Sequence, residues 1–170
     1  QKKDYEDQRR LEGRLVESKA ESGRISKRVS AARRDRFEKG RVAYKAAYGY
    51  RNKREESSPY RSFVEIVPDQ AKIVKEIFQM MAAGKYSLIT LTEELERKKY
   101  RKETYKRKEK VSVEEPFARS YLYYMLTNEA YLGKVKHLGR TVEMADPTAK
   151  PIIDNATFDK VQTILSSHSR

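Results

Sequence analysis

The first 39 residues of the chain contain almost nothing that would interrupt a helix. The apolar side chains among them fall near helical spacing, at Leu11, Leu15, Ile25, Val29 and Phe37. This pattern predicts one long helix, or two helices in line with weak points at Gly13 and the Ser22-Gly23 pair, and Gly40 as the C-cap. The stripe is too thin to be buried in a core, so we expect the helix to pack on a partner or to lie across a charged surface.

Regular apolar periodicity begins only after residue 61. The expected elements, in chain order, are a strand at 62–67, a helix that opens at Pro68 and is closed by Gly84, a helix capped by Ser87 that runs to residue 97, a helix at 117–127, a hairpin at 133–144 turning at Leu138-Gly139, and a last helix capped by Asp154. The side chains expected to face the core are Ile73, Val74, Ile77, Phe78, Met81, Leu88, Leu91, Leu95, Phe117, Leu122, Met125 and Leu126. Residues 97–110 show no apolar period and are predicted to be a loop or a frayed extension.

These elements predict an α+β fold that is mainly helical. We expect a long linking helix over residues 1–39, an extended basic linker over 40–61, and a compact domain over 62–168 that contains helices, a short strand and a β-hairpin. Within the linker, Tyr48 and Tyr50 are expected to anchor the chain to the core, whereas Tyr44 is freer.

The positive charge of the chain is concentrated in two segments. The net charge is +13, and residues 24–54 hold twelve Lys and Arg against two acids, while residues 97–110 hold nine against two. Because these two excesses together exceed the total, the rest of the chain is mildly acidic. Localised basic segments with interleaved tyrosines are typical of proteins that neutralise nucleic-acid phosphates.

The composition argues against several other classes of protein. The chain has no cysteine and only two histidines, so we expect no metal and no cofactor. No run approaches the roughly 20 apolar residues of a membrane-spanning helix. The N-terminal sequence lacks the apolar core of a secretion signal. We therefore expect a cytoplasmic protein without a membrane partner, encoded by a bacterium, a phage or a mobile element.

Four segments, in order, resemble a known family. They are AYGYR, VPDQAKIVKEIFQMMAAGKYSLITLTEELERKKY, FARSYLYYMLTNEAYLGKV and KPIIDNATFDKVQTIL. Together they look like the recombinase domain of the large serine recombinases, the phage integrases and transposon resolvases, over roughly residues 24–165. The Leu-x-Asn-x-x-Tyr-x-Gly box is intact from Leu126 to Gly133, Phe117 stands where the family has a tryptophan, and Ala47 replaces the proline of the Pro-Tyr-Gly-Tyr box.

The resemblance implies a division of labour in a longer protein. A catalytic domain would precede this chain and a zinc-binding domain would follow it, with residues up to about 39 as the connecting helix. The function implied is sequence-specific binding of double-stranded DNA, which positions the absent catalytic domain on attachment sites. Full-length members of the family act as dimers that assemble into tetramers on DNA.

The candidate DNA-binding residues come from five places in the sequence. In the long helix they are Arg24, Lys27, Arg28, Arg34 and Lys39; in the linker Arg41, Tyr44, Lys45 and Arg51; in the basic run Lys102, Lys106, Arg107 and Lys108; in the helix at 117–127 Arg119, Ser120, Tyr123 and Tyr124; and in the hairpin Lys134, Lys136 and Arg140. We expect the linker to follow the minor groove, where narrow stretches favour inserted arginine. The helices at 87–97 and 117–127 would form a helix-turn-helix-like pair with an unusually long turn, placing the second helix in the major groove.

Enzymatic alternatives are weak for this chain. The catalytic serine of a serine recombinase would lie outside it, so we expect the fragment itself not to cut DNA. His137 and Arg140 match the His-x-x-Arg pattern of tyrosine recombinases, but no tyrosine follows Tyr131 to act as nucleophile. The alternative that stays open is a general RNA-binding or ribosome-associated basic protein.

Overall fold

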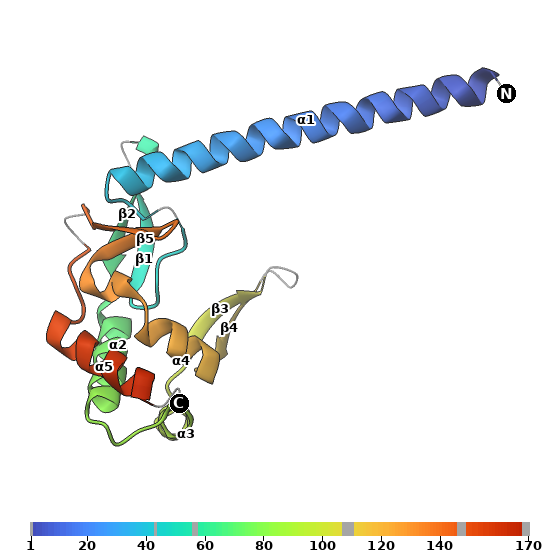
Figure 1. Ribbon diagram of the computed structural model, residues 1–170. Helices are drawn as coiled ribbons and strands as arrows, with labels where there is room; N and C mark the ends of the chain where they lie inside the picture. Colours follow the sequence, from blue (N-terminus) through green and yellow to red (C-terminus); the bar gives the residue numbers. More distant parts are fainter. Residues whose placement is uncertain (1, 43, 56–57, 107–110, 146–148, 168–170) are drawn as a thin grey trace.

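A long helix projects from a compact domain in the computed structural model of the chain (Figure 1). The structure describes all residues except 1, 43, 56–57, 107–110, 146–148 and 168–170, and it describes no side chains for residues 2–9, 54–55, 58–62 and 105–106. The elements are α1 (Lys2–Glu38), β1 (Tyr50–Glu55), β2 (Ser58–Ile66), α2 (Pro68–Ala82), α3 (Leu88–Arg97), β3 (Lys102–Lys106), β4 (Val111–Glu115), α4 (Arg119–Leu126), a 3-10 turn η1 (Glu129–Leu132), β5 (Lys134–His137), β6 (Arg140–Glu143) and α5 (Asn155–Ser167). The predicted mainly helical α+β fold is confirmed.

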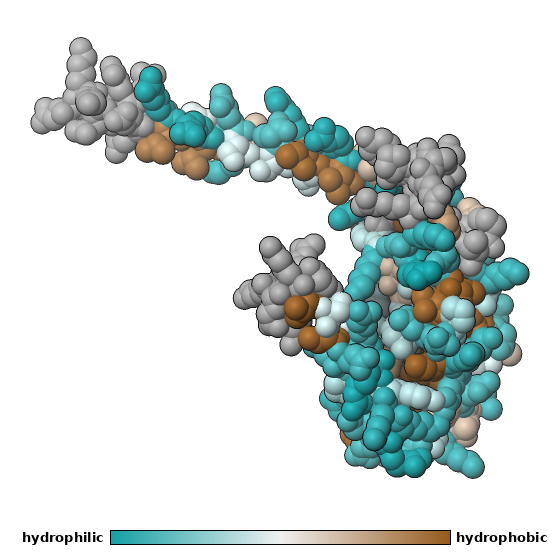
Figure 2. Space-filling model, turned by 180° about the vertical axis from the view of Figure 1, so that it is seen from behind, coloured by the Kyte–Doolittle hydropathy of each residue, from teal (hydrophilic) through white to brown (hydrophobic). Residues whose placement is uncertain are grey.

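Helix α1 is continuous, so Gly13 and Gly23 do not break it. Its apolar side chains gather along one side of the helix and stay exposed (Figure 2). Its C-terminal end contacts the domain, where Phe37 is 2% exposed. The side chains of residues 10–35 are all exposed, as the thin apolar stripe predicts.

The four helices of the domain form at the predicted places. Pro68 opens α2, and Ser87 caps α3 with a reciprocal pair of hydrogen bonds to Thr90. Asp154 caps α5 by accepting a hydrogen bond from the Thr157 backbone N–H at 2.8 Å. The fully buried side chains that join them include Val74, Ile77, Phe78, Met81, Leu91, Leu122, Met125, Leu126 and Val161. Ile73 and Leu88 pack against this core while remaining partly exposed.

Tyr131 occupies the centre of this core at 1% exposure. Its ring meets the edge of Phe78 and stacks near Tyr50, with centroids 5.6 and 6.2 Å away. Its hydroxyl donates to the Tyr48 carbonyl at 3.0 Å, and its own carbonyl accepts from the backbone of Ile152 and Ile153. One residue of the matched sequence box thus ties the N-terminal strip and the segment before α5 to α2.

Three antiparallel hairpins complete the fold, and only the one at 134–143 is where the sequence predicts it. The prediction of a loop over residues 97–110 is wrong, because β3 pairs with β4. The prediction of an extended linker over 40–61 is wrong for its second half, because β1 pairs with β2 from Tyr50↔Ile66 onward. Strand β2 also begins earlier than residue 62. Strand β1 and the β3–β4 hairpin are rich in charged and polar residues, so they lack the clear apolar alternation that would reveal them in the sequence. Strand β2, which contains the buried Val64, is the part of these two hairpins that the sequence predicted.

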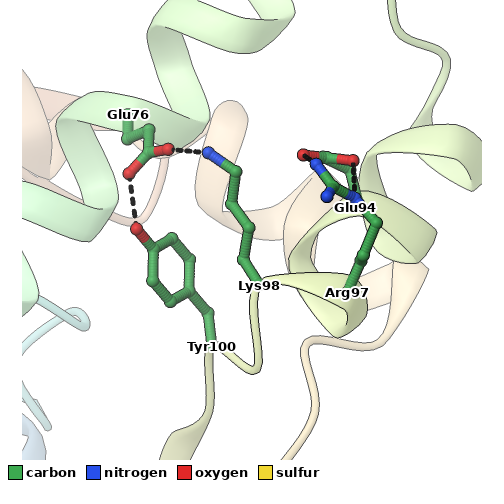
Figure 3. A network of polar contacts seen from close by, with 5 residues as sticks. All are labelled: Glu76, Glu94, Arg97, Lys98 and Tyr100. Atoms are coloured by element: carbon green, nitrogen blue, oxygen red, sulfur yellow. Dashed lines mark hydrogen bonds and ion pairs between the residues drawn. The ribbon is translucent and has the colours of Figure 1, made fainter.

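A polar network anchors the base of the β3–β4 hairpin to α2 (Figure 3). The Glu76 carboxylate accepts hydrogen bonds from Lys98 and from the Tyr100 hydroxyl, the latter at 2.7 Å. The hydrogen bonds from Lys98 and Tyr100 lower the pKa of Glu76. On the neighbouring turn, Arg97 holds Glu94 through two hydrogen bonds of 2.6 and 2.9 Å. The first residues of the basic run at 97–110 therefore stabilise the fold.

The junction between α1 and the domain is tight. Gly40 has φ +63°, and its carbonyl accepts from the Ala145 backbone N–H at 2.9 Å. A Cβ at this position would lie 2.5 Å from the Glu143 carbonyl oxygen. Only glycine therefore fits where the chain leaves α1 and packs against the end of the β5–β6 hairpin.

We expect Gly40→Ala to destabilise the domain more than Gly84→Ala. Both glycines have positive φ, but a Cβ on Gly84 would meet nothing within 4 Å. The control should therefore lose only the conformational term of about 1 kcal/mol, whereas Gly40→Ala should lose more through the backbone clash. Urea unfolding measures both losses, and equal losses would contradict this account of the junction.

We also expect stability to fall in alkaline solution. Burial raises the pKa of Tyr50 to about 12, so between its ordinary value of 10.0 and about 12 the unfolded chain releases a proton that the folded chain keeps. The free energy of unfolding should therefore decrease as the pH rises through this window. Tyr50→Phe should make the decrease shallower, although it also removes a hydrogen bond to the Lys150 carbonyl. Tyr123→Phe, which alters an exposed ring, should leave the slope unchanged. Urea unfolding across this pH range provides the measurement.

Candidate nucleic-acid interface

Residues predicted to bind DNA from three separate segments line one groove of about 330 Å³. They are Tyr44, Lys45, Tyr124, Lys134 and Lys136. The other lining residues are mainly apolar and include Val42, Ala46, Val135 and Met144. The fold thus brings the linker, the end of α4 and strand β5 to the same place, which sequence order alone does not indicate.

The linker reaches this groove because it packs on the core. Tyr50 is buried and Tyr48 is half-buried, which confirms that both anchor the strip. Their hydroxyls donate to the carbonyls of Lys150 and Arg101, at 2.9 and 3.3 Å. Burial raises the pKa of each tyrosine to about 12, so both hydroxyls stay protonated and can donate at neutral pH. The linker is therefore held against the core at Tyr48 and Tyr50 and is not free along its whole length.

Tyr44 is held in place even though 44% of it is exposed. Its hydroxyl forms a 2.7 Å hydrogen bond with His137 Nδ1, and its carbonyl accepts from Asn52 at 3.1 Å. The Arg33 guanidinium lies 5.3 Å from the ring centroid. Arg33 was missed from the sequence candidates, although it belongs to the same basic segment as Arg34.

Helix α4 presents a continuous polar and aromatic face. Arg119, Ser120, Tyr123 and Tyr124 are all exposed, while Leu122 on the opposite side is fully buried. The helix packs against α3, as predicted, but the connection between them is the β3–β4 hairpin. An exposed helix face of this composition can present side chains to a DNA groove.

Four of the candidate cations outside helix α1 pair with acids of the chain. Lys39 contacts Asp35 at 2.7 Å, Lys136 contacts Glu129 at 3.6 Å, and Arg51 contacts Glu65, whose pKa is lowered chiefly by that hydrogen bond. Lys102 contacts Glu115 at 3.0 Å and lies over the Tyr121 ring. Because the Lys102 side chain is mostly buried, it stabilises the hairpin base and is poorly placed to bind phosphate.

The other described candidates either have no acidic partner among the described residues or lie on α1. Lys45, Lys134, Arg41 and Arg119 form no ion pair within the described part of the chain. The α1 residues are exposed, with Arg24 in a 3.7 Å pair with Glu21 and no ion pair described for Lys27, Arg28 or Arg34. Arg140 lies over the Phe37 ring, with 5.6 Å to its centroid. The side chain of Lys106, and all of Arg107 and Lys108, lie outside the described residues.

Sequence analysis also missed three polar residues of the groove, Thr127, Asn128 and Glu129. Asn128 belongs to the matched box, which was the available signal. Its side chain accepts a 3.0 Å hydrogen bond from the Ala130 backbone and so starts η1, the turn that carries Tyr131. The Thr127 hydroxyl bonds to the Tyr123 carbonyl at 2.9 Å, which closes the end of α4.

The geometry offers no support for a phosphoryl-transfer site at His137 and Arg140. Both residues contact Phe37 at the end of α1, and His137 also contacts Tyr44 of the linker. In the described residues there is no group of three His, Cys, Asp or Glu side chains that could hold a metal ion. None of the described helices is long and apolar enough to cross a membrane.

Comparisons with known proteins agree with this architecture. The family described as Recombinase matches residues 68–168. A crystal structure of an LSR–DNA complex matches with a TM-score of 0.61 and 20% identity, over 84% of this chain and 38% of that chain. A structure from work on the sequence requirements of the Listeria innocua prophage attP site matches with a TM-score of 0.61 and 20% identity, over 82% of this chain and 51% of that chain.

The chain thus spans about half or less of the length of these two structures, and at 20% identity the likeness concerns the fold. No curated protein sequence matches it. The family match covers more than half of the chain and includes three of the four segments quoted above, nearly in full. The resemblance to a recombinase domain is confirmed, and this chain belongs to the recombinase family.

Proposed function

We propose that this chain is a sequence-specific duplex-DNA-binding module of a site-specific serine recombinase. It would hold a catalytic domain, located outside these residues, on attachment-site DNA during integration or excision. The observation that carries the proposal is the convergence of Tyr44, Lys45, Tyr124, Lys134 and Lys136 on one groove. Clustered cations with adjacent aromatic rings suit DNA better than general solubility.

The available charges suggest how the module binds. Lys45 and Lys134 come from segments far apart in sequence and have no acidic partner among the described residues, so both can contact phosphates and fix the register on the duplex. The exposed face of α4 would read base edges in the major groove through Arg119 and Ser120. Gly40 and Arg41 would lead the chain toward α1, whose exposed cations extend the contact along the DNA.

The proposal divides the chain into three functional parts. Residues 1–39 connect to the catalytic domain, residues 40–49 form the linker, and residues 50–168 form the DNA-binding domain. The pairing of β1 with β2 supports a boundary at residue 50. The full-length protein would act in the bacterial cytoplasm as a homodimer that assembles into a tetramer on DNA. This fragment alone would not cut DNA.

The RNA-binding alternative has no comparable support. The family match is to recombinases, and one of the similar structures is a complex with DNA. The groove also depends on a packed strip, whereas the alternative relied on long arms that fold on rRNA.

Competitive selection tests the proposal directly. The purified chain is incubated with a pool of random duplex DNA and structured RNA at near-physiological salt, and the retained molecules are sequenced. We expect enrichment of one duplex motif. Preferential retention of RNA, or equal retention of all molecules, would reject the proposed function.

The salt dependence of binding to the selected duplex should show whether the groove lysines contact phosphates. Each lost phosphate contact reduces the slope of log K against log salt by about 0.9, so Lys45→Ala with Lys134→Ala should flatten it by up to about 1.8 and weaken binding. The matched control is Lys72→Ala with Lys160→Ala, which removes the same charge from exposed positions on α2 and α5. Identical slopes for the two double variants would exclude the groove from the contact surface.

A further inference from the structure

The lining of the groove that carries the candidate cations is more apolar than phosphate contact requires. A phosphate needs accessible donors and positive charge, which Lys45 and Lys134 supply. The groove has a volume of about 330 Å³ and is also lined by Val42, Ala46, Val135 and Met144. Glu129, the one acidic residue among the described residues that line it, is paired with Lys136 at 3.6 Å. This volume lies at the lower end of the range of small-ligand sites, about 300–1,000 Å³, so the volume and the lining suit a small apolar group that carries negative charge nearby.

One aromatic ring of the groove is preorganised. Tyr44 is fixed by its hydroxyl bond to His137, its backbone bond from Asn52 and the Arg33 guanidinium over its ring. Surface tyrosines usually lose conformational freedom when they bind a ligand, and three such contacts remove most of that cost beforehand. A rigid, half-exposed ring beside an apolar floor is suited to stacking.

A second aromatic ring comes from α4. Tyr124 is 62% exposed and lines the groove, whereas its neighbour Tyr123, at 53% exposure, does not line it. Lys45 and Lys134 line the same groove. Positive charge combined with aromatic side chains is the recurring design of sites for single-stranded nucleic acid.

We propose that this groove binds an unpaired nucleotide of a DNA strand, with the base against Tyr44 and Tyr124 and the phosphates on Lys45 and Lys134. The faces of a base in an intact duplex are covered by its stacked neighbours, so the two rings can be used only by a base that has left the stack. This inference rests on the proposed nucleic-acid function but not on recognition of a duplex sequence. The module would thus hold a strand that is opened or unstacked while the rest of the protein acts on it.

The test compares two single-stranded probes that have the same number of phosphates. One is a short fluorescent oligothymidylate, and the other is an oligonucleotide of the same length built from abasic units. We expect the full chain to bind the oligothymidylate about tenfold more tightly, because stacking of one base on an aromatic side chain gives a preference of this order. Fluorescence anisotropy at fixed salt measures both affinities.

Three variants test whether the preference for the oligothymidylate over the abasic probe comes from the groove. Tyr124→Ala and Tyr44→Ala should each reduce it severalfold or abolish it, whereas Tyr123→Ala, the matched control on the same helix, should leave it intact. Equal binding of the two probes by the native chain would overturn the inference, as would a preference that survives both groove variants. Binding of the selected duplex is measured in parallel. If the native chain binds both single-stranded probes equally but still binds the selected duplex, the inference about the groove fails and the proposed function stands.

Discussion

The buried side chain of Tyr131 is the interaction on which the arrangement of the domain depends. Its ring packs between α2 and the linker, its hydroxyl bonds to the Tyr48 carbonyl, and its carbonyl accepts from Ile152 and Ile153. Segments more than 80 residues apart in sequence are therefore held by one side chain. Burial also raises its pKa well above the ordinary value, so the hydroxyl remains a donor throughout the physiological range.

The position of the candidate interface follows from this anchor. Because Tyr48 and Tyr50 are fixed against the core, the residues just before them cannot swing freely, and Tyr44 and Lys45 face the groove beside β5. The same turn that presents Tyr131 begins at Asn128, which lines the groove and follows Tyr124 at the end of α4. The spacing of the box from Leu126 to Gly133 thus has a structural consequence, because it connects the core tyrosine Tyr131 to the wall of the groove.

The parts of the fold that sequence reasoning predicted are those set by local periodicity. Helices α2, α3 and α5 have apolar stripes and start signals, namely Pro68 as the first residue of α2 and the caps Ser87 and Asp154, and these signals are local. The β3–β4 hairpin was missed because its order comes from pairs between distant residues, such as Glu76 with Lys98 and Lys102 with Glu115. For the same reason the sequence could not distinguish cations that stabilise the fold from those available to a ligand. Lys102 and Lys134 look alike in sequence, but only Lys134 lacks an acidic partner in the described structure.

The contacts at the end of α1 fix the direction of the whole helix relative to the domain. Helix α1 has 37 residues and is about 55 Å long at a rise of 1.5 Å per residue. Its direction is set by a small contact at one end, where Phe37 is buried between His137 and Arg140 and Gly40 pairs with Ala145. His137 also bonds to Tyr44, which lines the groove. His137 therefore contacts both the buried end of α1 and the wall of the groove, so the residue that helps to fix the direction of the helix also helps to fix the Tyr44 ring.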